Sequence, residues 1–169
     1  AKDRIVVDCV KSWSKNKPVE IRSPAATRPW QHVLEPLSGY LTLAQSIFED
    51  KNVQGNAYNF GPKSEQNRTV LELLKDMSML WDFDDSSQAY TITDDIPFYE
   101  SGLLKLNCDK ALMELKWESN LNYAETVKFV GDWYTKYKKG TDLYSLTEKQ
   151  IDTYETLAKE RKRVWANEG

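Results

Sequence analysis

Short predicted strands alternate with amphipathic helices along this sequence, and this alternation constrains the fold more than any other feature. The sequence predicts strands at residues 18–22, 57–60 and 88–93, with further extended stretches at residues 28–33 and 103–106. Each strand is short and its neighbours in sequence are helices, so the strands are too scattered to build a good sheet of their own. The sequence therefore predicts a mixed α/β fold whose elements complete a sheet begun elsewhere.

Apolar residues at helical spacing predict the remaining elements. Helices are expected at residues 5–13, 34–50, 70–81, 107–115, 122–140 and about 147–165. Two capping boxes, Thr69 with Glu72 and Asn122 with Glu125, support two of these starts. The second helix carries an apolar stripe of Leu37, Leu41, Ala44 and Phe48, and the last helix carries a stripe of Ile151, Tyr154, Leu157 or Ala158, and Trp165.

Length and charge narrow the class of protein. The 169 residues form a single predicted region, residues 1–169. This length suits one domain or a large piece of one. Lys and Arg number 23 and Asp and Glu number 26, a net charge of −3, which argues against nucleic acid as a partner. A single phosphorylated ligand remains compatible with this charge, because it needs only a local basic pocket. No apolar run approaches the roughly 20 residues that span a membrane.

The residues that usually carry metal or nucleophilic chemistry are few. Cys9 and Cys108 are the only cysteines, and both are predicted to be buried free thiols, which fits a reducing cytoplasm. His32 is the only histidine and is predicted to be a hydrogen-bonded strand residue, because one histidine without a carboxylate cluster makes no metal site. No Ser-His-Asp arrangement, P-loop or zinc spacing appears. We therefore assign no catalytic or metal-binding residue.

One long motif resembles a known family. The segment IRSPAATRPWQHVLEPLSGYLTLAQ, residues 21–45, closely resembles the CDP-glucose 4,6-dehydratases of the extended short-chain dehydrogenase/reductase group, and the core RPWQHVLEPLSGYL matches that branch at every letter. AYNFGP at residues 57–62, LKLNCDKALMELKW at 104–117, GTDLYSLTEKQI at 140–151 and DRIVVDCV at 3–10 extend the resemblance. It covers nearly all of this chain and only the later half of the family's length.

Two positions depart from the family pattern. Tyr99-Glu100 stands where the family is expected to have His-Glu, which puts in question what that His contributes to the pocket. Lys116 stands where the family favours glycine before the Trp of LKW.

The family's cofactor signature is absent. Such enzymes bind NAD on a glycine-rich turn after their first strand, because only glycine lets the backbone approach the pyrophosphate. The seven glycines of this chain include no G-x-G pair. The resemblance therefore implies the C-terminal, substrate-binding part of the enzyme, with the N-terminal Rossmann half that holds NAD missing from this sequence.

The resemblance assigns substrate-binding roles to five residues. Arg28 takes the family's diphosphate-binding position, where a guanidinium fork matches phosphate oxygens. Trp30, two residues on, is expected to face the same side of a strand and either lines the nucleotide pocket or belongs to the core. Arg4 and Arg22 match positions near the base and ribose, and Glu100 a position near the diphosphate or ribose.

One apparent catalytic motif is set aside. The family abstracts a proton with the Tyr of a Y-x-x-x-K motif, and Tyr134 and Lys138 have this spacing. The pair follows the substrate motif, whereas the family's catalytic pair precedes it, and i,i+4 spacing is common on helix surfaces. We interpret it as a helix-surface pair. The basic run at residues 159–163 is likewise expected to be a solvated helix face.

The resemblance implies that the intact enzyme is a lyase that converts CDP-D-glucose to CDP-4-keto-6-deoxy-D-glucose. NAD takes a hydride from C4, water leaves across C5 and C6, and the hydride returns to C6. The product serves deoxysugar biosynthesis for surface polysaccharide such as lipopolysaccharide O-antigen. The intact enzyme is expected to be a cytoplasmic homo-oligomer with no nucleic-acid or membrane partner.

Two alternatives remain open on the residues alone: a non-catalytic nucleotide-sugar binding module, and a helical interaction domain without a ligand. The 169-residue chain by itself is predicted to be inactive and poorly folded. The short strands would leave open edges, and the helix at residues 34–50 would expose an apolar stripe meant for the missing sheet.

Overall fold

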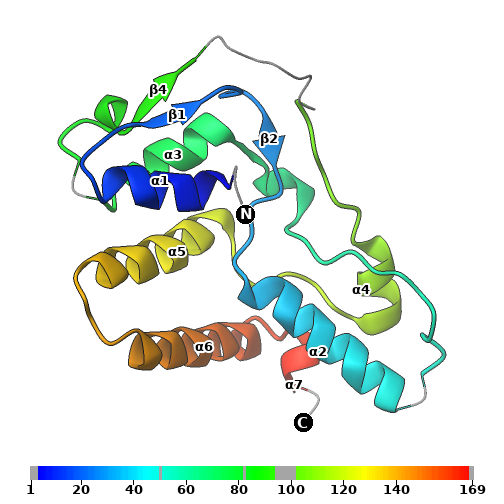
Figure 1. The fold of residues 1–169 in the computed structure, drawn as a ribbon. Coiled ribbons are helices and arrows are strands. Elements are labelled where there is room, and N and C mark those ends of the chain that lie inside the picture. Colours follow the sequence, from blue (N-terminus) through cyan, green and yellow to red (C-terminus); the bar gives the residue numbers. More distant parts are fainter. Residues whose placement is uncertain (1–3, 50, 82, 94–101, 168–169) are drawn as a thin grey trace. The chain divides into compact units, whose positions relative to one another are not determined.

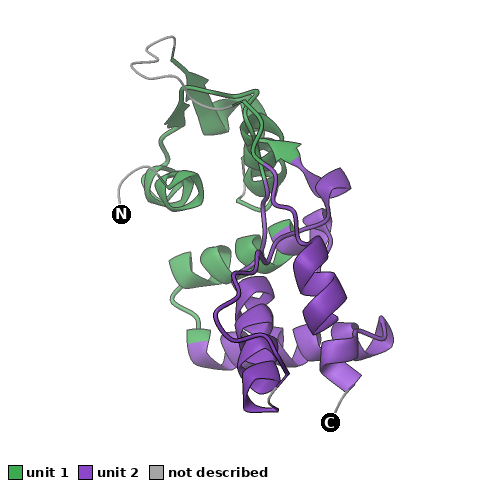
Figure 2. Ribbon diagram, turned by 90° about the vertical axis from the view of Figure 1, so that its right-hand side faces the viewer, with its two compact units in different colours: residues 1–28, 68–104, 127–143 green, residues 29–67, 105–126, 144–169 purple. Residues whose placement is uncertain are grey.

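The computed structural model describes residues 4–49, 51–81, 83–93 and 102–167 (Figure 1). The chain forms two compact units, each assembled from three separate stretches (Figure 2). Unit 1 comprises Ala1–Arg28, Arg68–Leu104 and Val127–Leu143, and unit 2 comprises Pro29–Asn67, Lys105–Thr126 and Tyr144–Gly169. The mixed α/β fold class predicted from the sequence is confirmed, with helix predominating over a few short strands.

Unit 1 holds every strand assigned within the described ranges. Its elements are α1 (Ile5–Trp13), β1 (Val19–Ile21), β2 (Thr27–Arg28), β3 (Arg68–Thr69), α3 (Val70–Ser78) and β4 (Tyr90–Ile92). β1 pairs with β4 in parallel, and β2 pairs with β3 in antiparallel orientation. The strands predicted at residues 18–22 and 88–93 are therefore confirmed, as are the first helix and the helix that begins at Val70.

The core of unit 1 forms around Trp13, which is fully buried. Its indole Nε1 donates a 2.7 Å hydrogen bond to the carbonyl oxygen of Ala89, and its ring lies 5.7 Å from that of Trp81 and 5.5 Å from that of Phe83. The partner carbonyl lets this polar indole N–H be buried without loss of a hydrogen bond.

α3 supplies the other side of the unit 1 core and follows its sequence pattern closely. The Thr69 hydroxyl accepts from the backbone N–H of Glu72, and the Glu72 carboxylate accepts from the backbone N–H of Thr69, so the predicted capping box is present. Leu74 is completely buried, and Leu73 and Met77 are almost completely buried.

Unit 2 is helical within its described residues. It contains α2 (Leu34–Phe48), α4 (Asp109–Leu115), nearly all of α6 (Leu143–Glu160) and α7 (Val164–Asn167). α5 (Tyr123–Lys138) contributes residues 123–126 to unit 2 and residues 127–138 to unit 1. The capping box predicted for α5 is confirmed, because Asn122 Oδ1 accepts from the Glu125 N–H and Glu125 Oε2 accepts from the Asn122 N–H.

The apolar core of unit 2 contains Val53, Phe60, Ala111, Leu115 and Trp117. The rings of Phe60 and Trp117 meet edge to face at 4.9 Å. Gly39 in α2 lies so close to Phe60 that a Cβ placed on it would stand 2.4 Å from the ring. Only glycine therefore lets α2 approach Phe60 this closely.

α2 buries several polar residues and exposes several apolar ones. Its buried side chains include Glu35, Ser38 and Ser46, whereas Leu41 is 72% exposed and Phe48 is 91% exposed. The prediction that the helix exposes an apolar stripe is confirmed.

Three predicted extended stretches differ from the structure. β2 ends at Arg28, because the next residue, Pro29, has no N–H to give to a ladder. Residues 57–60 form no strand; the carbonyl of Phe60 accepts instead from the Gln31 side chain. Residues 103–106 form only a single bridge, from Leu103 to Thr27.

The C-terminal helix is also different from its prediction. α6 begins at Leu143 and ends at Glu160, and Lys162 has a φ of 54°, which interrupts the helix before α7. Tyr154 and Ala158 are buried as predicted, but Ile151 is exposed. Among the described residues, no helix is both long and apolar enough to cross a membrane.

Candidate functional site

The predicted diphosphate-binding residue, Arg28, lies half-buried in β2 of unit 1. Its Nη1 donates a 2.9 Å hydrogen bond to the carbonyl oxygen of Thr27. In the ladder with β3, Thr27 is opposite Thr69 and Arg28 is opposite Arg68. Residues that face one another in an antiparallel pair project from the same face of the sheet. The side chain nearest Arg28 across the ladder is therefore another arginine.

β2 is held on its second edge by the chain that follows residue 101. The Thr27 N–H and hydroxyl both bond to the Gly102 carbonyl oxygen, at 2.8 and 3.2 Å, and Thr27 forms a parallel bridge with Leu103. Glu100, which the sequence assigns to the substrate site, lies outside the described residues.

The remaining predicted site residues fall in different places. Arg4 is exposed at the N-cap of α1, where its carbonyl accepts from the Asp8 N–H, and Arg22 is exposed directly after β1. Arg4, Arg22 and Arg28 all belong to unit 1, whereas Trp30 is half-buried in unit 2. The expectation that Trp30 and Arg28 share one side of a strand is wrong, because the strand ends at Arg28.

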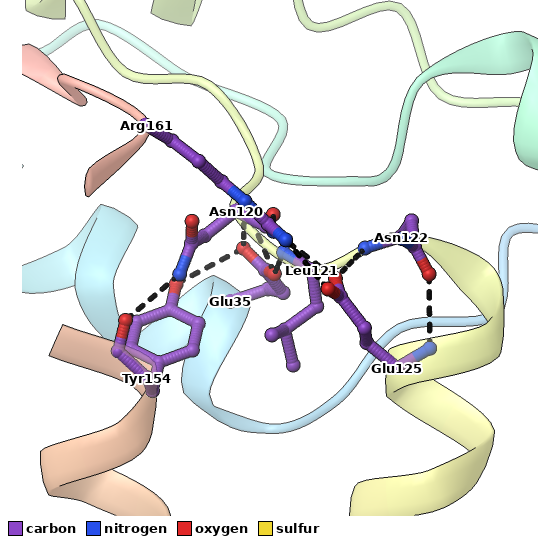
Figure 3. Close-up of polar contacts among 7 residues, drawn as sticks. All are labelled: Glu35, Asn120, Leu121, Asn122, Glu125, Tyr154 and Arg161. Atoms are coloured by element: carbon purple, nitrogen blue, oxygen red, sulfur yellow. Dashed lines mark hydrogen bonds and ion pairs between the residues drawn. The ribbon is translucent and has the colours of Figure 1, made fainter. Parts of the chain in front are cut away.

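Unit 2 contains a polar cluster that sequence reasoning missed (Figure 3). Glu35, only 1% exposed, accepts from the Asn120 N–H at 2.9 Å, the Leu121 N–H at 2.6 Å and the Tyr154 hydroxyl at 3.0 Å. Arg161 donates to the Asn120 carbonyl oxygen as well. These contacts join α2 to the segment before α5 and to α6, so the cluster holds the helices of unit 2 together.

Burial is the main cause of the pKa shifts of Glu35 and Tyr154 in this cluster. Burial raises the pKa of Glu35, and the hydrogen bonds from Leu121, Asn120 and Tyr154 only partly offset that increase. Burial also raises the pKa of Tyr154, with a further increase from the nearby Glu35 charge. At the edge of the cluster, the bond from Arg161 at 2.5 Å lowers the pKa of Glu125. This arrangement gives the buried Glu35 carboxylate and the Tyr154 hydroxyl hydrogen-bond partners, and its role is structural.

A cleft of about 580 Å³ opens in unit 2 between the chain after Phe60 and the start of α4. Its lining includes Gly61, Lys63, Asn107, Cys108 and Glu118. Lys63 and Glu118 form an ion pair at 3.2 Å, and the Cys108 thiol, which is half-buried rather than buried as predicted, has its pKa raised by burial. The cleft therefore offers little unbalanced charge for an anionic ligand.

A second hollow, of about 480 Å³, lies along the exposed face of α2. Leu37, Leu41, Ile151 and Trp165 line it, together with Tyr154 at its floor. Its largely apolar lining suits a packing partner better than a charged nucleotide.

The described residues include no cluster of potential metal ligands and no glycine-rich turn of the kind that NAD requires. No group of three or more potential metal ligands occurs among them. Gly39, Gly61 and Gly131 each have a side chain against their Cα, and none forms a G-x-G turn between a strand and a helix. The residues of this chain thus do not fit the role of a pyrophosphate cradle for NAD.

Tyr134 and Lys138 lie on α5, as the spacing predicts. The Lys138 ammonium stands 5.4 Å from the centre of the Trp81 ring, and the ring of Tyr134 packs edge-on against Trp133. Each side chain therefore has a packing partner of its own within unit 1, which agrees with a helix-surface pair.

Comparison with known proteins gives one close relative. The chain is 36% identical over 154 residues to CDP-glucose 4,6-dehydratase of Salmonella typhimurium, a match that covers 91% of this chain and 42% of that protein. The resemblance to the CDP-glucose 4,6-dehydratases is confirmed. The chain spans less than half the length of this curated relative. No protein-family model matches the chain.

A solved structure shows the same fold. UDP-glucuronic acid 4-epimerase from Bacillus cereus, in complex with UDP-glucuronic acid and NAD, superposes with a TM-score of 0.66 at 15% identity, over 80% of this chain and 40% of that one. The likeness to CDP-glucose 4,6-dehydratase thus comes from sequence, and the likeness to the epimerase from fold alone.

Proposed function

We propose that this chain is the nucleotide-sugar-binding part of an NAD-dependent CDP-glucose 4,6-dehydratase, a lyase that converts CDP-D-glucose to CDP-4-keto-6-deoxy-D-glucose. The observation that carries the proposal is the motif at residues 28–41, whose arginine lies half-buried in the β2–β3 ladder. The 36% identity to a CDP-glucose 4,6-dehydratase supports it. The product would enter deoxysugar biosynthesis for surface polysaccharide.

The substrate roles are those that the resemblance to the dehydratases implies for these positions. Arg28 binds the diphosphate with its planar fork of donors, and Arg4 and Arg22 contribute near the base and ribose from the same unit. By the same resemblance, Glu100 has a role near the diphosphate or ribose, and Trp30 a role in nucleotide binding. NAD is held by a part of the protein outside this sequence, because these residues offer no turn that would cradle it.

The exposed face of α2 is proposed to pack against that cofactor-binding part. Leu41 and Phe48 together expose a wide apolar surface, and the hollow beside them is lined mainly by apolar side chains. Uncovered surfaces of this kind favour association. We therefore propose that the 169-residue chain alone is inactive and self-associates, and that the whole protein is a homo-oligomer in the cytoplasm, where its free thiols Cys9 and Cys108 stay reduced.

The test uses the longer protein that carries this chain. With NAD present, it should convert CDP-glucose to a product that mass spectrometry shows to be lighter by one water, and the 169-residue chain should not. Binding of CDP-glucose without turnover in the longer protein would favour a non-catalytic binding module. Absence of binding would refute the proposal.

A substitution tests the proposed role of Arg28. Arg28→Ala should weaken CDP-glucose binding by about tenfold or more, since a charged hydrogen-bonding group is lost, and should leave NAD affinity unchanged. Titration calorimetry with each ligand measures both constants. Lys17→Ala, which removes an exposed cation of the same unit, is the matched control.

A further inference from the structure

The basic run KERKR, predicted to be a solvated helix face, is partly bound within unit 2. Arg161 holds the Glu125 carboxylate through both terminal guanidinium nitrogens, at 2.5 and 3.0 Å, and also donates to the Asn120 carbonyl oxygen (Figure 3). Arg163, with its side chain only 14% exposed, pairs with Glu118 at 2.5 Å. The end of the run is therefore tied by charge to the segment before α5 and to the first turn of that helix.

Trp165 provides a third attachment, directly after the two arginines. Its indole Nε1 donates a 3.2 Å hydrogen bond to the Glu118 carbonyl oxygen. Its ring stacks on that of Tyr154, with 5.8 Å between the ring centres. Every second residue from Arg161 to Trp165 thus binds another part of unit 2.

The backbone of residues 161–167 contributes little to holding this segment in place. α6 ends at Glu160, and the left-handed conformation of Lys162, with a φ of 54°, interrupts the helix. α7 has only four residues, far fewer than a helix that is stable by itself in water, and none of them is buried. The side-chain contacts of the two arginines and Trp165 therefore decide whether the segment stays closed.

We infer that residues 161–167 form a clasp, which opens as a local unit and thereby uncovers the hollow beside α2. Trp165 and Ala166 line that hollow, and the Trp165 ring covers Tyr154 at its floor. When the clasp opens, this wall leaves the hollow and the Tyr154 ring meets solvent. A segment with few buried contacts opens at a lower free energy than the whole fold. The clasp does not depend on the proposed enzymatic activity.

Limited proteolysis of the longer protein that carries this chain measures the opening. Trypsin cuts after lysine and arginine, so the clasp has cleavage sites at Arg161, Lys162 and Arg163. At low trypsin concentration the cleavage rate follows the fraction of open clasp, and intact-mass spectrometry identifies the bond that is cut. Below the unfolding transition this rate should depend only weakly on urea, because local opening exposes little surface. A dependence as steep as that of global unfolding would overturn the inference.

Two substitutions far from the cleavage sites test what holds the clasp closed. Glu118→Gln and Glu125→Gln keep the size of each side chain and remove the charge that an arginine binds, and glutamine also serves in the capping box of α5. Each should raise the cleavage rate by about threefold to fivefold, the effect of losing one partly exposed ion pair. Glu148→Gln, which changes an exposed carboxylate of α6, is the matched control and should be cleaved like the wild type. Unchanged cleavage in both test variants would contradict the clasp.

Hydrogen exchange gives a second readout that needs no protease. The Arg163 N–H bonds to the Ala158 carbonyl oxygen at 2.9 Å, and the Ala166 N–H bonds to the Arg163 carbonyl oxygen at 3.0 Å, so both are protected while the clasp is closed. Both should exchange faster than the N–H groups in the middle of α6, and Glu118→Gln should accelerate them by the same factor as it accelerates cleavage. Equal protection of the clasp and of α6 would show that no local opening occurs and would refute the inference.

Discussion

α3 in unit 1 and α2 in unit 2 use their amphipathic faces in opposite ways. α3 turns Leu74 inward until it is fully buried and keeps its capping box at the surface. α2 turns Glu35 inward and leaves Leu41 72% exposed. An apolar stripe therefore does not by itself identify the buried face of a helix: α3 is stabilised by apolar burial, whereas α2 is held on its inner face by hydrogen bonds.

The largest effect is expected from removing the buried carboxylate of α2. Glu35→Ala leaves the N–H groups of Asn120 and Leu121 and the hydroxyl of Tyr154 without their acceptor. The free energy of unfolding should fall by about 3–5 kcal/mol, since each buried unsatisfied group costs roughly 1–3 kcal/mol. Urea denaturation followed by tryptophan fluorescence measures this loss.

The control for Glu35 lies at the other end of the same region. Glu49, the exposed C-cap of α2, bonds to Lys51 and Gln45 at the surface, so Glu49→Ala should leave the denaturation midpoint unchanged. Equal losses in the two variants would show that the buried network does not hold α2.

Leu74 on the buried face of α3 and Leu41 on the exposed face of α2 form a matched pair that tests the comparison directly. Leu74→Ala should cost about 2–5 kcal/mol, because it opens a cavity in the unit 1 core. In the 169-residue chain, diluted until it is monomeric, Leu41→Ala should change stability by less than about 0.5 kcal/mol, because its side chain is mostly exposed. Urea denaturation of both variants gives the comparison.

The same Leu41 variant also tests whether α2 is covered in the longer protein. There, if the α2 face packs on the cofactor-binding part as proposed, Leu41→Ala should cost much more than in the 169-residue chain. Equal small losses in both contexts would contradict that packing.

The buried polar region next to α2 should also respond to pH. Burial lowers the pKa of His32 to about 4, from 6.5 in an exposed histidine. Between these values the unfolded chain binds a proton that the folded chain does not, so stability falls as the pH falls through this window. The full loss is at most about 3 kcal/mol, at 1.36 kcal/mol for each pKa unit.

The variant His32→Asn identifies the source of that pH dependence. It keeps an acceptor for the Leu34 N–H, which bonds to His32 Nδ1 at 3.3 Å, and it does not titrate. Denaturation midpoints measured at several pH values should be flatter for the variant than for the wild type over this window. Parallel curves would assign the dependence to another group.

The smallest effect is expected at Lys116, where the chain departs from the pattern of the dehydratases that it resembles. Lys116 caps α4 with a φ of 55°, in the left-handed region where a side chain costs energy and glycine does not. The family's preference for glycine at this position has its explanation in that conformation. Lys116→Gly should stabilise the protein by about 0.5–1 kcal/mol, to be measured as a small rise in the thermal midpoint.

Local signals were predictable from the sequence, and non-local ones were not. The capping boxes at Thr69 and Asn122 depend on residues three positions apart, so both were predicted correctly. The buried state of Glu35 depends on partners 85 to 119 residues away, which no periodicity reveals. α2 also carries an apolar pattern, but Leu41 and Phe48 of that pattern are exposed in this chain.

The same distinction between local and non-local signals applies to the candidate site. The motif around Arg28 was recognisable as a string of letters, and its resemblance to the dehydratases is confirmed. The position of Arg28 opposite Arg68 carried no signal, because it depends on the pairing of two strands separated by about forty residues of chain. Only an expectation of the β2–β3 register would have predicted this pairing.

The interleaving of the two units in sequence has a consequence for folding during synthesis on the ribosome. Unit 1 takes its last stretch from Val127–Leu143 and unit 2 from Tyr144–Gly169, so neither is complete until most of the chain has left the ribosome. At roughly 5–20 residues per second, the first helix waits several seconds for residues that complete its unit. Contacts between stretches so distant in sequence also slow folding. The early stretches of both units thus emerge as unfinished surfaces, which chaperones would be expected to recognise during synthesis.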